Sequence, residues 1–122
     1  MNDAEFIEHV RDRQSMYGLI GTYHPTATFI MGFDQARVGG LLRGFHEWLA
    51  VRNGELSSQH WMGKVLAEAL PDLGVRGFEN LHLDQEQERQ AVDRLFSLVL
   101  EFLAVRDDPR ALASMYVQYH AL

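Results

Sequence analysis

The sequence predicts an all-α protein: a single compact bundle of about six helices, with a long helix near the C-terminus and one domain spanning residues 1–122. Two observations predict this fold. Apolar residues recur at i, i+3 and i+4 through most of the chain, which is the spacing of one helix face. Capping residues, glycines and prolines interrupt that pattern at intervals typical of helix ends.

The first helix is expected to begin at Asp3, which can serve as its N-cap, and to end near Arg13. Glycines and a proline lie within residues 14–25, so this stretch predicts a loop. The apolar face of this first helix consists of Phe6, Ile7 and Val10.

Two further helices are expected on either side of Gly39-Gly40, which breaks or bends the chain. Thr26 or Thr28 begins the earlier one, whose apolar residues are Phe29, Ile30, Phe33 and Ala36. The later one starts at Leu41, and Asn53-Gly54 supplies its stop signal. Its helical stripe is Leu41, Leu42, Phe45, Trp48, Leu49 and Arg52.

A fourth helix is expected to be capped by Ser57 or Ser58 and ended by Pro71. Its apolar stripe is Trp61, Met62, Val65, Leu66, Ala69 and Leu70. Residues 72–83 have no helical period, and they predict the longest loop, a kind of segment that is often functional. A short strand at 78–83 is the alternative, although it has no obvious partner.

The long helix opens with the acids of residues 84–88, where the helix dipole favours negative charge. Its expected core face is Ala91, Val92, Leu95, Phe96, Val99, Phe102 and Leu103. Asp108 as N-cap and Pro109 at the first helical position begin the last helix. That helix is expected to bury Leu112, Met115, Tyr116 and Tyr119.

Composition excludes several classes of function. The net charge is −6, and the ten arginines and the single lysine, Lys64, are scattered among acids, so the basic stripe of a nucleic-acid-binding protein is missing. The chain has no cysteine, which excludes thiolate chemistry and disulfides. An acidic N-terminus and the lack of a long apolar run predict a cytoplasmic protein without membrane contact.

Motifs for catalysis and cofactor binding are missing from the sequence. No two of the six histidines stand at i, i+3 or i+4, and His-Glu-x-x-His does not occur. Neither a Gly-x-Ser-x-Gly elbow nor a Walker or Rossmann glycine loop is present. We therefore expect no catalytic residue, no metal and no cofactor.

Four segments carry a family resemblance. They are Arg13-Gln14-Ser15-Met16-Tyr17, Gly39-Gly40, Phe45-His46-Glu47-Trp48-Leu49-Ala50-Val51-Arg52 and the part of the long helix from 93 to 102. They resemble Arg-Pro-x-Met-Tyr, a Gly-rich turn, Phe-x-x-Trp-Leu-x-x-Arg and a long C-terminal helix in a group of small bacterial proteins from high-GC genomes. Gln14 stands where those proteins carry proline.

Proteins of this type resemble the immunity proteins of polymorphic or contact-delivered bacterial toxins. The resemblance implies a protein that binds a cognate toxin and covers its active site or its target-binding site. Toxins that act on nucleic acids are commonly basic, so an acidic surface would complement such a partner.

The residues expected to contact this partner are acids and aromatic anchors. Those at the start of the long helix are the most available, those in the 72–83 loop come next, and the tyrosines lie in the loop of residues 14–25. The candidates are Asp84, Glu86, Glu88, Asp72, Glu79, Tyr17 and Tyr23. For Tyr17 the alternative is that it packs with Met16 under the loop and closes the bundle.

Two other functions compete with partner binding. One is a small-molecule-binding or regulatory helical domain, monomeric or homodimeric, with a pocket between helices lined by Trp48, Trp61 and Tyr119. The other is an enzyme that reverses a toxin's modification, with a cleft joining His46, Glu47 and His60.

Overall fold

The computed structural model describes residues 1–73 and 82–122, and the regular structure in these two stretches is entirely helical. Their α-helices are α1 (Asp3–Asp12), α2 (Tyr23–Ala36), α3 (Phe45–Asn53), α4 (Trp61–Ala69), α5 (Gln85–Arg106) and α6 (Pro109–His120). Two short 3-10 turns are η1 (Gln14–Tyr17) and η2 (Pro71–Leu73). The all-α class and the long helix near the C-terminus are confirmed. Of the strand suggested for 78–83, only residues 82–83 are described, and they are not in a strand.

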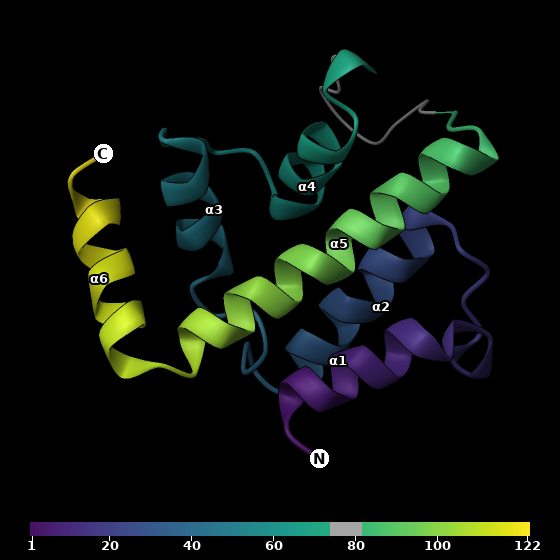
Figure 1. The fold of residues 1–122 in the computed structure, drawn as a ribbon, viewed down its shortest axis with the longest axis horizontal. Coiled ribbons are helices and arrows are strands. Elements are labelled where there is room, and N and C mark those ends of the chain that lie inside the picture. Colours follow the sequence, from purple (N-terminus) through teal and green to yellow (C-terminus); the bar gives the residue numbers. More distant parts are fainter. Residues whose placement is uncertain (74–81) are drawn as a thin grey trace.

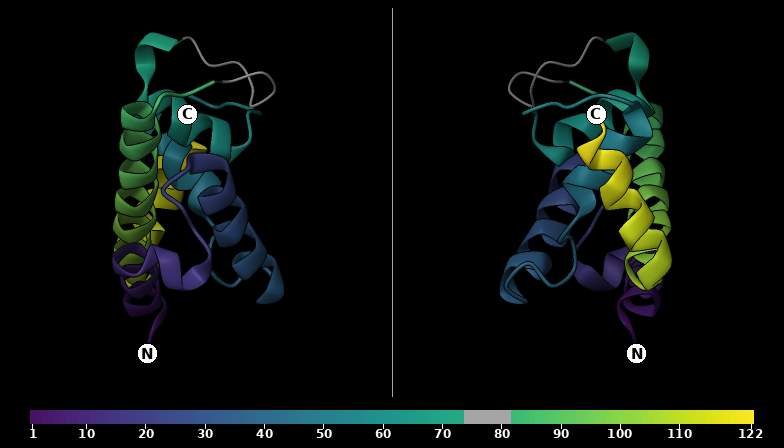
Figure 2. Two further views of the ribbon diagram at one scale, coloured as in Figure 1. Left: turned by 90° about the vertical axis from the view of Figure 1, so that its right-hand side faces the viewer. Right: turned by 90° about the vertical axis from the view of Figure 1, so that its left-hand side faces the viewer.

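The other α-helices are arranged around α5. It runs diagonally across the molecule, with α1 and α2 on one side, α4 on the other, and α3 and α6 towards its C-terminal end (Figure 1). Each of these five helices contacts α5. The side views show that α2 begins near α5 and slants away from it (Figure 2).

Both the cap and the buried face of α5 follow from its sequence. Asp84 Oδ1 accepts a hydrogen bond from the Gln87 amide at 2.8 Å, and Gln87 Oε1 accepts one from the Asp84 amide at 2.9 Å. This capping box satisfies backbone donors that a helix start otherwise leaves unpaired. The predicted core face is confirmed, and Leu98 widens it. Each of the following side chains exposes 3% or less: Ala91, Val92, Leu95, Phe96, Leu98, Val99, Phe102 and Leu103.

The N-cap of α1 is Asn2, not Asp3 as predicted. The Asn2 side chain accepts a hydrogen bond from the Glu5 amide at 2.8 Å. The Asp3 carboxylate instead binds two arginines from distant elements, Arg37 and Arg106. A sequence pattern ranks both residues as good caps, and the tertiary ion pairs decide between them.

The second helix begins at Tyr23, three residues before Thr26. Pro25 fits inside its first turn, because the amides of a first turn have no acceptor within the helix. The Thr26 hydroxyl donates to the Thr22 carbonyl at 2.7 Å. The predicted loop of residues 14–25 is therefore reduced to 18–22, since residues 14–17 form η1.

Two other helix starts also differ from the predicted ones. The stripe that begins at Leu41 becomes helical only at Phe45, because residues 37–44 form a turn. The N-cap of α4 is His60, whose Nδ1 accepts from the Met62 amide at 3.2 Å. The Ser57 hydroxyl accepts a local hydrogen bond within the preceding loop and caps no helix.

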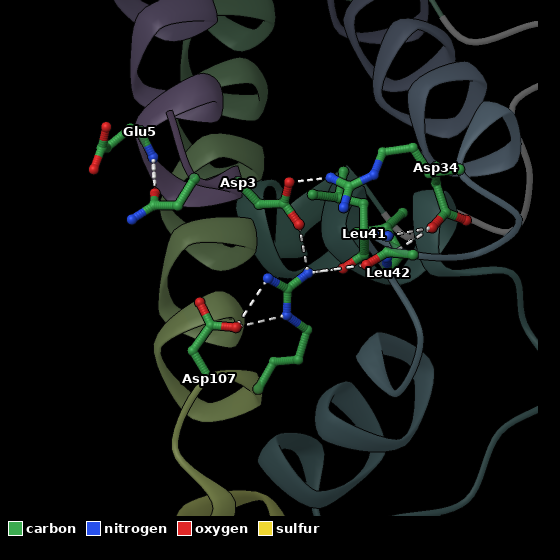
Figure 3. Close-up of polar contacts among 10 residues, drawn as sticks. Asp3, Glu5, Asp34, Leu41, Leu42 and Asp107 are labelled. Atoms are coloured by element: carbon green, nitrogen blue, oxygen red, sulfur yellow. Dashed lines mark hydrogen bonds and ion pairs between the residues drawn. The ribbon is translucent and has the colours of Figure 1, made fainter.

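A side chain of α2 and a glycine hold the turn of residues 37–44. Asp34 Oδ1 accepts from the amides of Leu41 and Leu42 at 3.1 and 2.7 Å (Figure 3). Gly44 has φ of 95°, and a Cβ atom there would lie 3.0 Å from the hydroxyl of Tyr116. Glycine is thus required both by the backbone angle and by the approach of α6.

Arg106, the last residue of α5, joins three parts of the fold. Its Nη1 donates to Asp3 Oδ2 and to the Gly40 carbonyl, each at 3.0 Å, and to the Leu41 carbonyl at 3.2 Å (Figure 3). Its Nε donates to Asp107 at 2.9 Å. The planar guanidinium can serve several acceptors at once, which a lysine could not do in this geometry.

The last helix is less buried than predicted. The N-cap Asp108 accepts from the Arg110 and Ala111 amides, which confirms the predicted start. Of the four residues expected to be buried, only Met115 is; Leu112, Tyr116 and Tyr119 are half-buried. The helix lies at the outside of the bundle, where it contacts α3 and α5.

In the described part of the chain, no helix combines the length and the apolar character needed to cross a membrane.

Replacing Asp3 by Asn should destabilise the protein by about 1–3 kcal/mol at pH 7, because the hydrogen bonds from two guanidiniums lose their charged acceptor. Burial alone would raise the pKa of Asp3, but the hydrogen bonds and charges of Arg37 and Arg106 outweigh it, so the pKa lies below the usual 3.8. A lowered pKa in the folded state stabilises the protein above the unfolded pKa.

That stabilisation is lost as the pH falls through the lowered pKa in the folded state. We therefore expect the difference in unfolding free energy between wild type and Asp3→Asn to stay constant down to about pH 4 and to shrink below it. Urea unfolding of both proteins over a pH series measures this difference. A difference that persists undiminished in strong acid would contradict the assigned ion pairs.

Candidate functional site

The start of α5 and the segment between α1 and α2 together enclose a groove of about 610 Å³. On one side the lining residues are Gln14, Ile20 and Gly21. On the other they are Asp84, Gln85, Glu86, Arg89, Val92 and Asp93. These residues define what we call the acidic groove.

The charge of the acidic groove is set by three carboxylates and one guanidinium. Arg89 lies between two of the acids: its Nε donates to Glu86 at 3.0 Å and its Nη1 to Asp93 at 2.9 Å. The hydrogen bond from Arg89 outweighs desolvation and lowers the pKa of Glu86, so this carboxylate is ionised at neutral pH. Asp84 uses one oxygen for the cap of α5 and is exposed. Negative charge therefore exceeds positive charge in the groove.

An apolar side chain stands beside these acids. Ile20 exposes 82% of its surface, whereas Val92 on the groove wall exposes only 3%. A partner that covered Ile20 would bury apolar surface next to the carboxylates. No sequence signal marks Ile20, because two apolar residues between loop glycines, Leu19 and Ile20, form no periodic pattern. Asp93 could have been found, since it lies seven residues after Glu86 and thus on the same face of the helix.

Glu88, the third predicted acid of α5, has a structural role. It is half-buried, and its Oε2 accepts a hydrogen bond from the Tyr23 amide at 2.6 Å. Tyr23 is the first residue of α2, so Glu88 supplies an acceptor for an amide at the start of that helix. The sequence groups Glu88 with Glu86, but in the structure the carboxylate of Glu88 binds the start of α2 and does not line the groove.

Tyr23 is not the loop residue that the sequence predicts. Its side chain is 2% exposed, and its hydroxyl donates to the Met62 carbonyl at 2.6 Å. Burial raises the pKa of its phenol, which keeps the hydroxyl protonated as a donor. Tyr23 is therefore removed from the candidates for surface contact, and it links α2 to α4.

Tyr17 closes the junction of α1 and α2. Its hydroxyl lies 2.6 Å from His9 Nδ1, and its ring meets the rings of Phe6 and Phe29 edge-on at centroid distances of 6.0 and 5.6 Å. The packing interpretation of Tyr17 is confirmed. Met16, which was expected to pack with it, is 67% exposed.

The candidates from the long loop lie apart from the acidic groove. Asp72 belongs to η2, is exposed, and lines a separate hollow of about 210 Å³ whose other wall includes Gln87 and Gln90 of α5. Glu79 falls outside the residues that the structure describes. The structure thus brings Asp84 and Glu86 together with Asp93, and it places Asp72 elsewhere.

Two of the three aromatic residues suggested for a small-molecule pocket, Trp48 and Trp61, pack in the core. Trp48 and Trp61 both pack on Phe45, with ring centroids at 5.9 and 5.7 Å. Trp48 also lies 6.0 Å from the ring of Phe102. Tyr119 is half-buried on α6 and contacts His120. The ring contacts of the two tryptophans are those of core packing, whereas Tyr119 lies on the outer helix.

His46 and His60, suggested as parts of an enzymatic cleft, contact different groups. His60 uses its Nδ1 to cap α4, whereas His46 Nδ1 lies 3.4 Å from Nζ of Lys64. Within residues 1–73 and 82–122, no group of three or more histidine, aspartate or glutamate side chains is placed to hold a metal ion.

Comparison with known proteins adds no relative. No family model, no curated protein and no solved structure matches the chain.

Glu88 and Glu86 offer a test of which acid supports the fold. Replacing Glu88 by Ala should lower the free energy of unfolding by about 1–3 kcal/mol, because the Tyr23 amide loses a charged acceptor. The same change at exposed Glu86 should leave the free energy of unfolding unchanged within error. Urea unfolding compares the two variants, and equal effects would show that the contact between Glu88 and α2 carries no stability.

Proposed function

We propose that this protein binds a basic polypeptide through the acidic groove, and that this partner is a cognate toxin whose active or target-binding site it covers. The observation that carries the proposal is the juxtaposition of three carboxylates with the exposed side chain of Ile20. It combines the charge and the apolar surface that a protein interface uses together.

The carboxylates of the groove are suited to fast recognition of a basic surface. An excess of one charge attracts an oppositely charged partner and raises the association rate. Arg89 already holds Glu86 and Asp93 by hydrogen bonds, so less side-chain entropy is lost when a partner arrives. The capping box fixes the helix start that presents them.

Ile20 supplies the apolar part of the proposed contact. It lies in the short loop between η1 and α2, whose ends are fixed by the contacts of Tyr17 and Tyr23. Covering its exposed surface would add apolar burial to the interface, at roughly 25 cal/mol per Å² removed from water.

The identification of the partner as a toxin rests on the family resemblance. An immunity protein needs a well-ordered surface and no chemistry of its own. Two segments of that resemblance, residues 13–17 and 45–52, form η1 with its preceding residue and most of α3, so they belong to the fold. In this proposal the partner binds at the acidic groove.

Co-expression with the product of the gene immediately upstream tests this function. We expect that product to arrest growth when it is expressed alone, and we expect this protein to restore growth and to co-purify with it. Restored growth without a stable complex would indicate an enzyme that reverses damage. If growth is not restored and no complex forms, this product is not the partner.

Neutralising the groove should weaken the complex. The double variant Glu86→Gln, Asp93→Asn leaves Asp84 opposite Arg89, so the excess negative charge of the groove is removed. We expect the association rate to fall about ten-fold at low salt and much less at high salt. Stopped-flow or surface-binding kinetics with the co-purified partner measures the rate.

A matched control removes two exposed acids from α1, as Glu5→Gln, Glu8→Gln. It changes the net charge by the same amount, but neither residue lines the acidic groove. If both double variants slowed association equally, the effect would come from overall charge and not from the groove.

A further inference from the structure

A hollow of about 520 Å³ lies between the turn that follows α2 and the last helix. Its walls come from the turn (residues 37–40 and Arg43), from the end of α5 (Arg106) and from α6 (Leu112 and Tyr116). We call this space the arginine hollow. It is at the opposite end of α5 from the acidic groove, so it is a separate site.

The three arginines of the hollow differ in their partners. Asp3 lies between Arg37 and Arg106 and pairs with both of them (Figure 3). Arg43 is exposed, and its Nη2 donates to the Val38 carbonyl at 3.3 Å. Among the described residues, no carboxylate lies within ion-pair distance of Arg43. Of the cations described in this hollow, Arg43 therefore keeps an unpaired charge.

Tyr116 adds a hydroxyl group to the hollow. Its side chain is half-buried, and its hydroxyl makes no hydrogen bond with the residues that the structure describes. Burial raises the pKa of this phenol and the charge of Glu47 raises it further, while the charge of Arg43 acts in the opposite direction. The hydroxyl is therefore protonated at neutral pH and can donate a hydrogen bond. Because the charge of Arg43 acts on the phenol, the guanidinium and the hydroxyl are near each other.

Val38 has a backbone conformation that valine normally avoids. Its φ is 56°, and in the described part of the chain it is the only residue other than glycine with a positive φ. It follows the C-cap of α2, where glycine is the usual residue because a β-branched side chain is strained there. The Val38 side chain nevertheless exposes 82% of its surface, so packing within the chain does not compensate for the strain. Strain of this kind points to a function for the exposed side chain.

We infer that the arginine hollow binds a small organic acid that carries one carboxylate and one apolar group. The carboxylate accepts hydrogen bonds from the guanidinium of Arg43 and from the hydroxyl of Tyr116, and the apolar group covers Val38 and Leu112. Arg43 uses one of its five N–H groups within the chain, so a pair of donors remains for a planar carboxylate.

The charges around the hollow favour a single negative charge on the ligand. One guanidinium is unpaired, since Asp3 already holds Arg37 and Arg106. The carboxylates of Asp3 and Glu47 would repel further negative charge, as the action of Glu47 on Tyr116 indicates. A neutral molecule of the same shape would leave the charge of Arg43 unused. Apolar monocarboxylates are therefore preferred both to phosphate and to the corresponding amides.

Titration of the isotope-labelled protein with hydrocinnamate, followed by amide chemical shifts, tests the site. We expect saturable shifts at residues 37–43 and 112–116. Hydrocinnamamide, the neutral molecule of the same shape, and inorganic phosphate should bind at least about ten-fold more weakly, since each lacks part of the match. Equal binding of acid and amide, or of acid and phosphate, would overturn the ligand class, and shifts confined to other residues would overturn the site.

Two arginine variants separate the hollow from the overall charge. Arg110 is exposed on the first turn of α6 and does not line the hollow. Arg43→Gln and Arg110→Gln change the net charge by the same amount. We expect Arg43→Gln to weaken the binding of hydrocinnamate about ten-fold and Arg110→Gln to leave it nearly unchanged. Equal weakening in both variants would show that Arg43 makes no specific contact with the ligand.

Val38→Asn tests whether the strained residue is kept for the ligand. Asparagine tolerates a left-handed backbone better than valine, so the urea midpoint of the variant should equal or exceed that of the wild type. Its affinity for hydrocinnamate should fall several-fold, because the apolar contact is lost. A purely structural residue would not combine these two effects. A lower urea midpoint, or unchanged affinity, would contradict a role of Val38 in binding.

The same chemistry occurs at the carboxyl end of a peptide whose last residue is apolar. Acetyl-Gly-Gly-Phe presents a carboxylate and a ring like those of hydrocinnamate, and the two are titrated side by side. We expect the free acid to bind at least as tightly, because ordering the peptide chain costs entropy. Tighter binding of the tripeptide would contradict a small-molecule ligand and assign the hollow to a peptide end.

Discussion

The burial of one face of α5 is the constraint on which the rest of the structure depends. Its eight fully or almost fully buried residues lie between Ala91 and Leu103, and every other α-helix packs against this helix. A helix in isolation gains little stability, so tertiary packing of such a face is what maintains it. Because the buried face ends before Arg106 and begins only after Arg89, both ends of the helix are left free for polar contacts.

The polar residues at the two ends of α5 have different roles. At the C-terminal end, the guanidinium of Arg106 is satisfied by Asp3, by two carbonyls and by Asp107, so it stabilises the fold. At the N-terminal end, Arg89 pairs with Glu86 and Asp93 while Asp84 caps the helix, so negative charge remains exposed beside Ile20. The first arrangement connects α1 and the turn of residues 37–44, and the second leaves a surface suited to a basic partner.

Features with a local cause could be predicted from the sequence, and features created by distant contacts could not. The core face of α5, its acidic start and the Asp108 cap follow from periodicity and capping rules, which act within a few residues. The glycine and proline near Tyr23 predict a loop, whereas its amide and hydroxyl bind Glu88 and Met62, far along the chain. The burial of Lys64 has the same origin, since a lysine in an apolar stripe carries no local signal of its depth.

The central claim is that the acidic groove is the surface that meets the partner. Amide hydrogen exchange of the free protein and of its complex with the co-expressed upstream product tests this claim most directly, because it reports on every described helix at once. We expect new protection at residues 19–22 and 84–93, with little change in α6. Protection confined to α6, or to the turn of residues 37–44, would contradict it and place the interface at the opposite end of α5.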